Sequence, residues 1–130
     1  MKKLFLFLLL VPICVNAGLF EYKCIIQQEL FLQDNGVLKT YPNNLYVGES
    51  FIVDRVNGKV LGNPLSNRTA SKIILHSKGD EDRPFELVSF SSLSIGKADT
   101  DYIYVKEYKD TPDKAFLATT GDSVFAGICK

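Results

Sequence analysis

The sequence has no excess of charge of either sign. Its 130 residues include 15 Lys and Arg against 15 Asp and Glu, so the formal net charge is zero. Nucleic-acid-binding domains usually carry a basic excess, and attraction to anionic membranes also depends on basic residues. The balance therefore disfavours a nucleic-acid partner and an anionic membrane surface.

Tryptophan is absent, histidine and methionine occur once each, and there are three cysteines. Metal sites usually need several His, Cys, Asp or Glu ligands at suitable spacing. A nucleophile in an active site usually needs an adjacent base, and only one histidine is present to act as that base. The sequence therefore predicts no metal, no cofactor and no catalytic residues.

Long hydrophobic runs are missing except at the amino terminus. A basic start at residues 1–3 precedes an unbroken apolar run over residues 4–11, and Pro12 and Ala17 follow. This layout is typical of a secretory signal peptide, and it is shorter than the roughly 20 apolar residues of a membrane-spanning helix. We expect cleavage after Ala17, because Val15 and Ala17 are small or tolerated residues at the −3 and −1 positions of such a site. Lipid attachment at Cys14 is the alternative, but it would need a smaller residue than Ile13 before it.

Cleavage would leave one domain of residues 18–130 with no stable membrane anchor. Its 113 residues carry 13 basic and 15 acidic side chains, a net charge of −2. A chain of this length can bury enough surface to fold alone, with a modest margin. The short Lys-Lys leader is typical of bacteria, so the predicted location is the periplasm or the cell exterior.

The cysteine count becomes even once the leader is removed. Cys24 and Cys129 remain, one near each end of the domain, and an exported pair usually forms a disulfide. Metal ligation and a reactive thiol are the alternatives, and only His76 could assist either of them. Because a disulfide needs Cα atoms within about 7 Å, we expect the first and last strands to be neighbours.

Alternation of apolar and polar residues with a period of two dominates the domain and predicts an all-β fold. We expect a small antiparallel β-barrel or sandwich of about eight strands, and the terminal disulfide favours a closed or nearly closed barrel. Asn57 and Gly58 predict a hairpin with a type I′ turn, which needs positive φ at both positions. The expected strand segments are residues 20–33, 37–41, 45–47, 50–56, 59–61, 72–77, 85–90, 101–108, 115–120 and 123–129.

The segment of residues 101–108 offers a candidate binding face. If Ile103 and Val105 face the core, the alternate positions point outward, where tyrosine rings and hydroxyls suit peptide or sugar binding. Cross-strand packing, or tyrosines turned inward to fill a barrel, are the alternatives. The candidate face consists of Tyr102, Tyr104, Lys106 and Tyr108.

Two charged positions have both a structural and a functional interpretation. His76 is either a general base or a histidine at a sheet face or rim, and the sequence around it has no triad signature. Arg55, beside Asp54, is either an anchor for an anionic ligand or part of a rim salt bridge. The structural interpretation is preferred for both.

Three further motifs are weaker. Residues 80–82 and 99–101 offer oxygen ligands to Ca²⁺, but acidic residues are also ordinary in turns. Asn67 begins an N-glycosylation sequon, which we expect to be unused in a bacterial protein. Residues 94–97 match the Ser-x-x-Lys spacing of acyl transferases without their companion motifs, so we interpret the match as chance.

Several short motifs carry a resemblance: Tyr22-Lys-Cys24, Phe51-x-Val53-Asp54-Arg55 with Gly58, Tyr104-x-Val-x-Glu107-Tyr108, and Gly127-x-Cys129. With them the chain resembles small exported bacterial proteins of unknown function, which implies no activity. The Tyr-x-Cys start and serine-rich residues 91–98 are also similar to periplasmic inhibitors of C-type lysozyme, which are small disulfide-linked β-barrels. Their inhibitory loop ends in Ala-x-Tyr, whereas no tyrosine stands two residues after Ala98.

The sequence therefore predicts an exported, non-enzymatic β-domain that binds a protein or glycan partner. One alternative is a carrier of a small apolar ligand inside a barrel. A periplasmic lysozyme inhibitor and a hydrolase that uses His76 are two others.

Overall fold

The computed structural model describes residues 20–92 and 98–130, so the predicted leader and the Ser-x-x-Lys motif lie outside the described residues. The described chain has no helix and folds into one antiparallel sheet, which confirms the all-β prediction. Its strands are β1 (Glu21–Leu32), β2 (Leu38–Thr40), β3 (Ser50–Asp54), β4 (Val60–Gly62), β5 (Lys72–Lys78), β6 (Phe85–Ser92), β7 (Ala98–Val105), β8 (Lys114–Thr120) and β9 (Ser123–Cys129).

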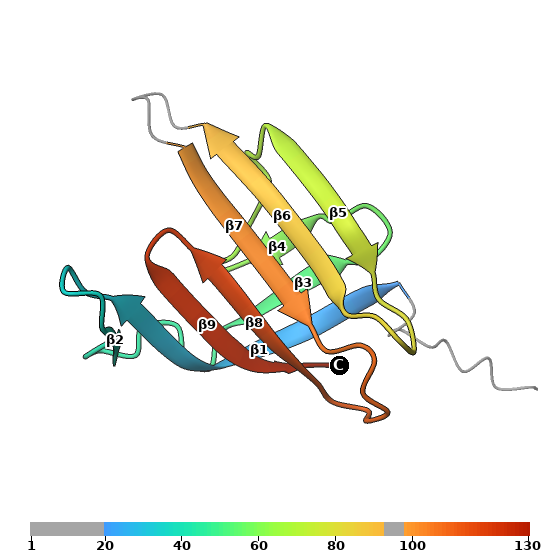
Figure 1. Cartoon of the computed structure of the whole chain (residues 1–130), viewed down its shortest axis with the longest axis horizontal. Helices are drawn as coiled ribbons and strands as arrows, with labels where there is room; N and C mark the ends of the chain where they lie inside the picture. Colours follow the sequence, from blue (N-terminus) through green and yellow to red (C-terminus); the bar gives the residue numbers. More distant parts are fainter. Residues whose placement is uncertain (1–19, 93–97) are drawn as a thin grey trace, which may run out of the picture.

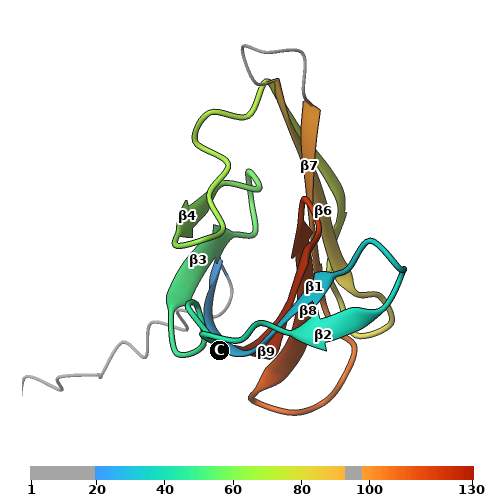
Figure 2. The same ribbon diagram turned by 90° about the vertical axis from the view of Figure 1, so that its left-hand side faces the viewer.

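The sheet is curled into a half-barrel. Its strand order is β4-β3-β1-β9-β8-β7-β6-β5, and β2 pairs with β1 off this path. Figure 1 shows β5 to β9 as one broad wall with β3 and β4 behind it. Figure 2 shows the two walls from the side, with β1 running between them at the base. The barrel is therefore open, because β4 and β5 end the strand order instead of pairing.

The first and last strands lie side by side, as the two cysteines predicted. Cys24 faces Cys129 directly in the β1–β9 register, and their Cα atoms are 3.9 Å apart across the disulfide. Lys23 and Lys130 beside them exchange two backbone hydrogen bonds of 2.9 Å. The disulfide is confirmed, and it is compatible with an oxidising, exported compartment.

A bulge at Gln27 divides β1 into two halves. Burial follows even positions as far as Ile26 and then changes phase, so that Glu29 is buried. This shift is what one extra residue in a strand produces. Gly127 of β9 lies opposite Ile26. A Cβ added at Gly127 would lie only 2.0 Å from the carbonyl oxygen of Ile25. The first half of β1 consequently pairs with β3 and the second half with β2.

Aromatic side chains fill the space between the two walls. Phe51 of β3 meets Phe116 of β8 edge to face, with ring centroids 5.1 Å apart. Tyr22 meets Phe85 in the same way at 5.3 Å. Full burial of a side chain such as phenylalanine is worth about 1.5–3 kcal/mol. The interior of the described half-barrel is thus a packed core.

Side chains hold the open side of the half-barrel together. Arg55, in the β3–β4 loop, donates from Nη2 to the carbonyl oxygens of Lys78 and Gly79 at 3.2 and 3.4 Å. The same nitrogen lies 3.4 Å from Oε1 of Glu107, beyond the end of β7. The hairpin at one end of the sheet is in this way tied to the turn after β5 at the other end.

The β3–β4 hairpin forms where it was predicted, but the type I′ prediction is wrong. Gly58 has φ of 74°, whereas Asn57 is not among the residues with positive φ. Asp54 organises a longer loop, because its Oδ1 accepts hydrogen bonds from the backbone N–H groups of Val56 and Asn57 at 2.7 and 3.1 Å. Glycine is favoured at position 58 because φ of 74° lies in a region that other residues rarely adopt, and a Cβ there would also lie 2.8 Å from Cδ1 of Leu87.

One predicted strand is absent and several strand ends differ, including the end of β7. Residues 45–47 form a turn instead of a strand, and β7 ends at Val105. Lys106 still donates its backbone N–H to Ala115 at 2.9 Å, but the next N–H, that of Glu107, bonds back to Val105 and turns the chain. Lys106 and Tyr108 therefore lie in the β7–β8 loop, which local alternation could not reveal.

Candidate functional site

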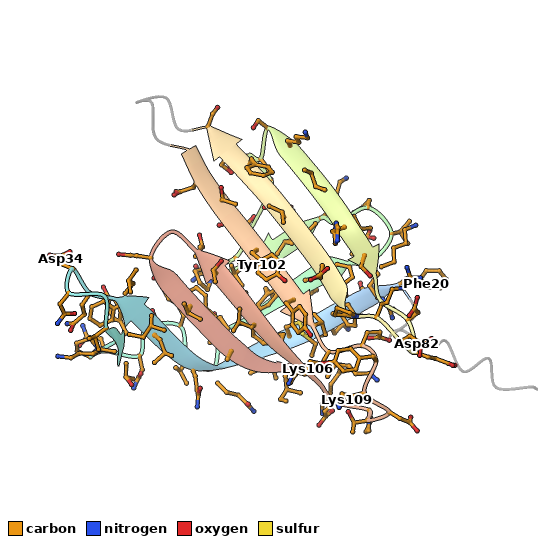
Figure 3. The ribbon with its side chains drawn as sticks, viewed as in Figure 1. Phe20, Asp34, Asp82, Tyr102, Lys106 and Lys109 are labelled. Atoms are coloured by element: carbon orange, nitrogen blue, oxygen red, sulfur yellow. A yellow bond between two sulfur atoms is a disulfide. The ribbon has the colours of Figure 1, made fainter. Side chains whose placement is uncertain are left out.

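The predicted tyrosine face points outward. Ile103 and Val105 are buried in the core at 2% and 0% exposure, so Tyr102 and Tyr104 lie on the opposite side of β7. Tyr102 pairs with Val88 and Thr119, and Tyr104 with Glu86 and Leu117, on the neighbouring strands. Figure 3 shows Tyr102 over the broad wall of β5 to β9, and Lys106 nearer the loop that carries Lys109.

Hydrogen bonds hold the two tyrosines in place. Tyr102 donates its hydroxyl to Oε1 of Glu86 at 3.1 Å, and the hydroxyls of Tyr104 and Tyr108 lie 3.3 Å apart. Burial, followed by the hydrogen bond to Glu86, raises the pKa of Tyr102. The hydrogen bond to Tyr108, followed by burial, raises the pKa of Tyr104 to about 12. Both phenols are therefore neutral near pH 7, with their rings available for contact.

A hollow of about 430 Å³ lies beside these tyrosines. Leu117 in its wall is 40% exposed and adds apolar surface beside the tyrosines. Lys106 is exposed and has no ion-pair partner among residues 20–92 and 98–130. The hollow thus combines an apolar wall, neutral phenols and a cation. Its lining includes Tyr102, Tyr104, Lys106, Ala115, Leu117 and Ala126.

A second polar cluster, the inner cluster, lies on the core-facing side of the sheet. There the Tyr22 hydroxyl donates to Oε2 of Glu107 at 2.5 Å. The Arg55 guanidinium lies 4.7 Å from the centroid of the Tyr22 ring and 3.4 Å from Oε1 of Glu107. Burial and the hydrogen bond to Glu107 raise the pKa of Tyr22. The rim salt bridge predicted for Arg55 is confirmed, and its guanidinium is engaged in closing the half-barrel.

The sequence interpretation did not single out Glu107 or the Tyr22 hydroxyl. A signal was present, because Glu107 shares its alternation face with Ile103 and Val105, which face the core. A carboxylate on such a face needs a buried partner. Which partners it meets depends on Tyr22 and Arg55, which are distant in sequence and lie on other elements.

His76 lies at the rim of the sheet, on the edge strand β5. It occupies a bulge between Leu75 and Ser77 in the β5–β6 register, and its side chain is 73% exposed. Its Nε2 lies 3.7 Å from Oε2 of Glu86. Bulges and charges on edge strands discourage pairing with other chains, and that role fits this position. The rim interpretation is thereby supported.

The acidic turn of residues 80–82 is closed by an arginine. Arg83 donates to Oδ2 of Asp80 from Nε and Nη2 at 2.9 and 2.6 Å. These bonds lower the pKa of the Asp80 carboxyl. Among the residues that the structure describes, no group of three or more His, Cys, Asp or Glu is placed to hold a metal ion.

One residue of the other acidic segment, Asp101, and one of the sequon, Asn67, face inward, whereas Asp99 and Thr69 are exposed. Burial raises the pKa of Asp101, which pairs with Ser89 of β6 and Thr120 of β8. Asn67 is 5% exposed, and its side-chain amide donates to the carbonyl of Gly58 at 2.7 Å. The side-chain amide of Asn67, the group that a glycan would modify, is therefore hydrogen-bonded within the folded protein.

No protein-family model matches this chain, and neither a curated protein nor a solved structure shows significant similarity to it. Within the described part of the chain, a search for helices long and apolar enough to cross a membrane found none. The candidate site therefore rests on the geometry of the chain itself.

Proposed function

We propose that this protein is an exported, non-enzymatic module that binds a protein or glycan partner on the outer face of β7 and β8. The observation that carries the proposal is the outward placement of Tyr102 and Tyr104 beside an unfilled hollow. Tyrosine suits such a surface, because a rigid ring supplies apolar area and the hydroxyl supplies a hydrogen bond.

Export to the periplasm or the cell exterior is part of this proposal. It is supported by the leader pattern in residues 1–17 and by the buried Cys24–Cys129 disulfide. Disulfides persist mainly in oxidising compartments outside the cytosol.

A binding role on the surface is preferred over transport inside the barrel or catalysis. Phe51, Phe85 and Phe125 are each buried to below 2% exposure, so they occupy the space that a carried ligand would need. The His76 imidazole lies beside the Glu86 carboxylate, whereas a hydrolytic base would hydrogen-bond a nucleophile. Both observations favour the outer face.

Tyr104→Ala tests the proposal. The variant should lose capture of partners from an exported-protein extract or from cell-wall glycans, while its melting temperature stays close to that of the wild type. Tyr41→Ala, which removes a tyrosine outside the candidate face, should keep full capture and serves as the control. A large loss of stability in Tyr104→Ala would instead assign this ring to packing.

C-type lysozyme is a specific first partner to test, because the Tyr-x-Cys start is similar to that of periplasmic lysozyme inhibitors. Inhibition of lysozyme by the wild type, but not by Tyr104→Ala, would make this protein an inhibitor that acts through the tyrosine face. Equal inhibition by both would place the contact elsewhere.

A further inference from the structure

Two hollows lie next to each other on the outside of the sheet. The hollow beside Tyr104 reaches Ala115 and Ala126, and a second hollow of about 540 Å³ is lined by Ile25 and Ile128. Their lining residues are neighbours, because Ala115 lies directly opposite Ile128, which in turn lies opposite Ile25. We call this surface the outer groove; its floor consists of Tyr104, Leu117, Ala126, Ala115, Ile128 and Ile25.

Small side chains create the groove. Ala115 and Ala126 lie on the two central strands, where Ala115 is opposite Ile128 and Ala126 is opposite Leu117. The larger Leu117 and Ile25 are 40% and 50% exposed. Four neighbouring strands, β7, β8, β9 and β1, cross beneath it. At a strand spacing of about 4.8 Å, the groove is roughly 14 Å long, enough for four or five residues of an extended chain.

Lysines surround this apolar floor. Lys106 lies at the β7 end and has no ion-pair partner in the described parts of the chain. Lys23 and Lys130 lie at the β1 end, and their acidic neighbours, Glu21 and Asp113, are 3.9 and 3.8 Å away and exposed. Exposed pairs of this kind contribute about 0–1 kcal/mol, so the lysines are available to another anion. Asp113 itself lines the second hollow, so three lysines and two carboxylates border the floor, an excess of one positive charge.

We propose that the outer groove binds an acidic, apolar segment of a protein partner. Apolar side chains of the segment would cover Leu117 and Ile128, and its carboxylates would pair with Lys106 at one end and Lys23 at the other. This inference rests on the proposed binding function and names the class of partner. It narrows the class of partner, because an excess of positive charge around the groove favours a partner of opposite charge.

The floor favours protein over glycan. Sugars bind best on flat aromatic rings, whereas the floor beyond Tyr104 is built from alanine, leucine and isoleucine. A second copy of this chain is also disfavoured. The groove lies on the side of the sheet opposite the buried core, and the sheet is curled (Figure 2), so two such convex faces would touch over a small area. A flexible or concave segment can follow the groove.

An NMR titration tests the proposal. The probe is a capped eight-residue peptide of alternating Leu and Glu, and the control peptide has Lys in place of each Glu. The acidic peptide should shift the backbone amide signals of Ala115, Leu117, Ala126 and Ile128 in a saturable way that weakens with added salt. The proposal is overturned if these signals do not move, or if the basic peptide moves them equally.

Two variants locate the contact. Ala126→Leu fills the groove and should abolish the shifts, while Lys106→Gln should weaken binding about twofold to fivefold, as expected for one rim charge. Lys72→Gln, at an exposed lysine of β5, is the matched control and should bind like the wild type. Unchanged binding by Ala126→Leu, with its melting temperature preserved, would refute the groove.

The failure of this inference can be told apart from failure of the proposed function. If Tyr104→Ala loses partner capture while Ala126→Leu and Lys106→Gln retain it, the tyrosine face binds and the groove does not. If an oligomer of N-acetylglucosamine shifts the groove signals and the acidic peptide does not, the partner is a glycan, and the protein class is refuted. If all three variants capture normally, both proposals fail.

Discussion

Removal of the Cys24–Cys129 disulfide should lower stability by an amount that follows from the length of the loop it closes. The two cysteines are 105 residues apart in sequence, and the chain-entropy model gives about 4.7 kcal/mol at 25 °C for a loop of this length. For a domain of this size, 1 kcal/mol corresponds to a shift in melting temperature of about 4 °C, so we expect a fall of roughly 20 °C at most.

The assay compares urea unfolding of the oxidised protein, the protein reduced after unfolding, and the double variant Cys24→Ala/Cys129→Ala. The reduced protein keeps both sulfur atoms, so its difference from the oxidised form isolates the cross-link. The double variant should lose more, because both cysteines are fully buried and their replacement leaves a void. Removing the cross-link should also increase the dependence of unfolding on urea, since the unfolded chain exposes more surface. A loss below about 1 kcal/mol on reduction would refute the argument that the link acts through the unfolded chain.

Two further predictions concern partly buried carboxylates. Glu107→Gln should lower the free energy of unfolding by about 1.5–3 kcal/mol, the usual contribution of a hydrogen bond to a charged group, because Tyr22 and Arg55 lose their anionic partner. Glu86→Gln, on the outer face, should cost less, and equal losses in urea melts would contradict the assigned role of the inner cluster. Asp101→Asn should raise the melting temperature at pH 7, because burial raises the pKa of Asp101 and its charge is then unfavourable in the folded state. The gain should disappear as the pH falls to about 4, near the pKa of an unfolded aspartate, and a gain independent of pH would refute this explanation.

The outcome for β7 shows how far local patterns reach. Alternation correctly predicted that Ile103 and Val105 face the core and that Tyr102 and Tyr104 face outward, because side-chain direction in a strand has a period of two. It failed at Lys106 and Tyr108, because the strand ends where the chain turns toward β8. It also could not show that Glu107 meets Tyr22 and Arg55, since that contact joins three elements far apart in the sequence.

The sequence alone determined that this protein is built from strands and that its first and last strands are neighbours. Both conclusions depend on features that are local or that involve two residues. These are the period-two pattern, the turn residues, and the two cysteines that remain once the predicted leader is removed. The tertiary structure decided that the barrel stays open between β4 and β5, that Arg55 and Glu107 close it, and that Ala115 and Ala126 lie at the centre of a groove. These features depend on which strands lie next to one another and in what register, which long-range packing sets and no local pattern specifies.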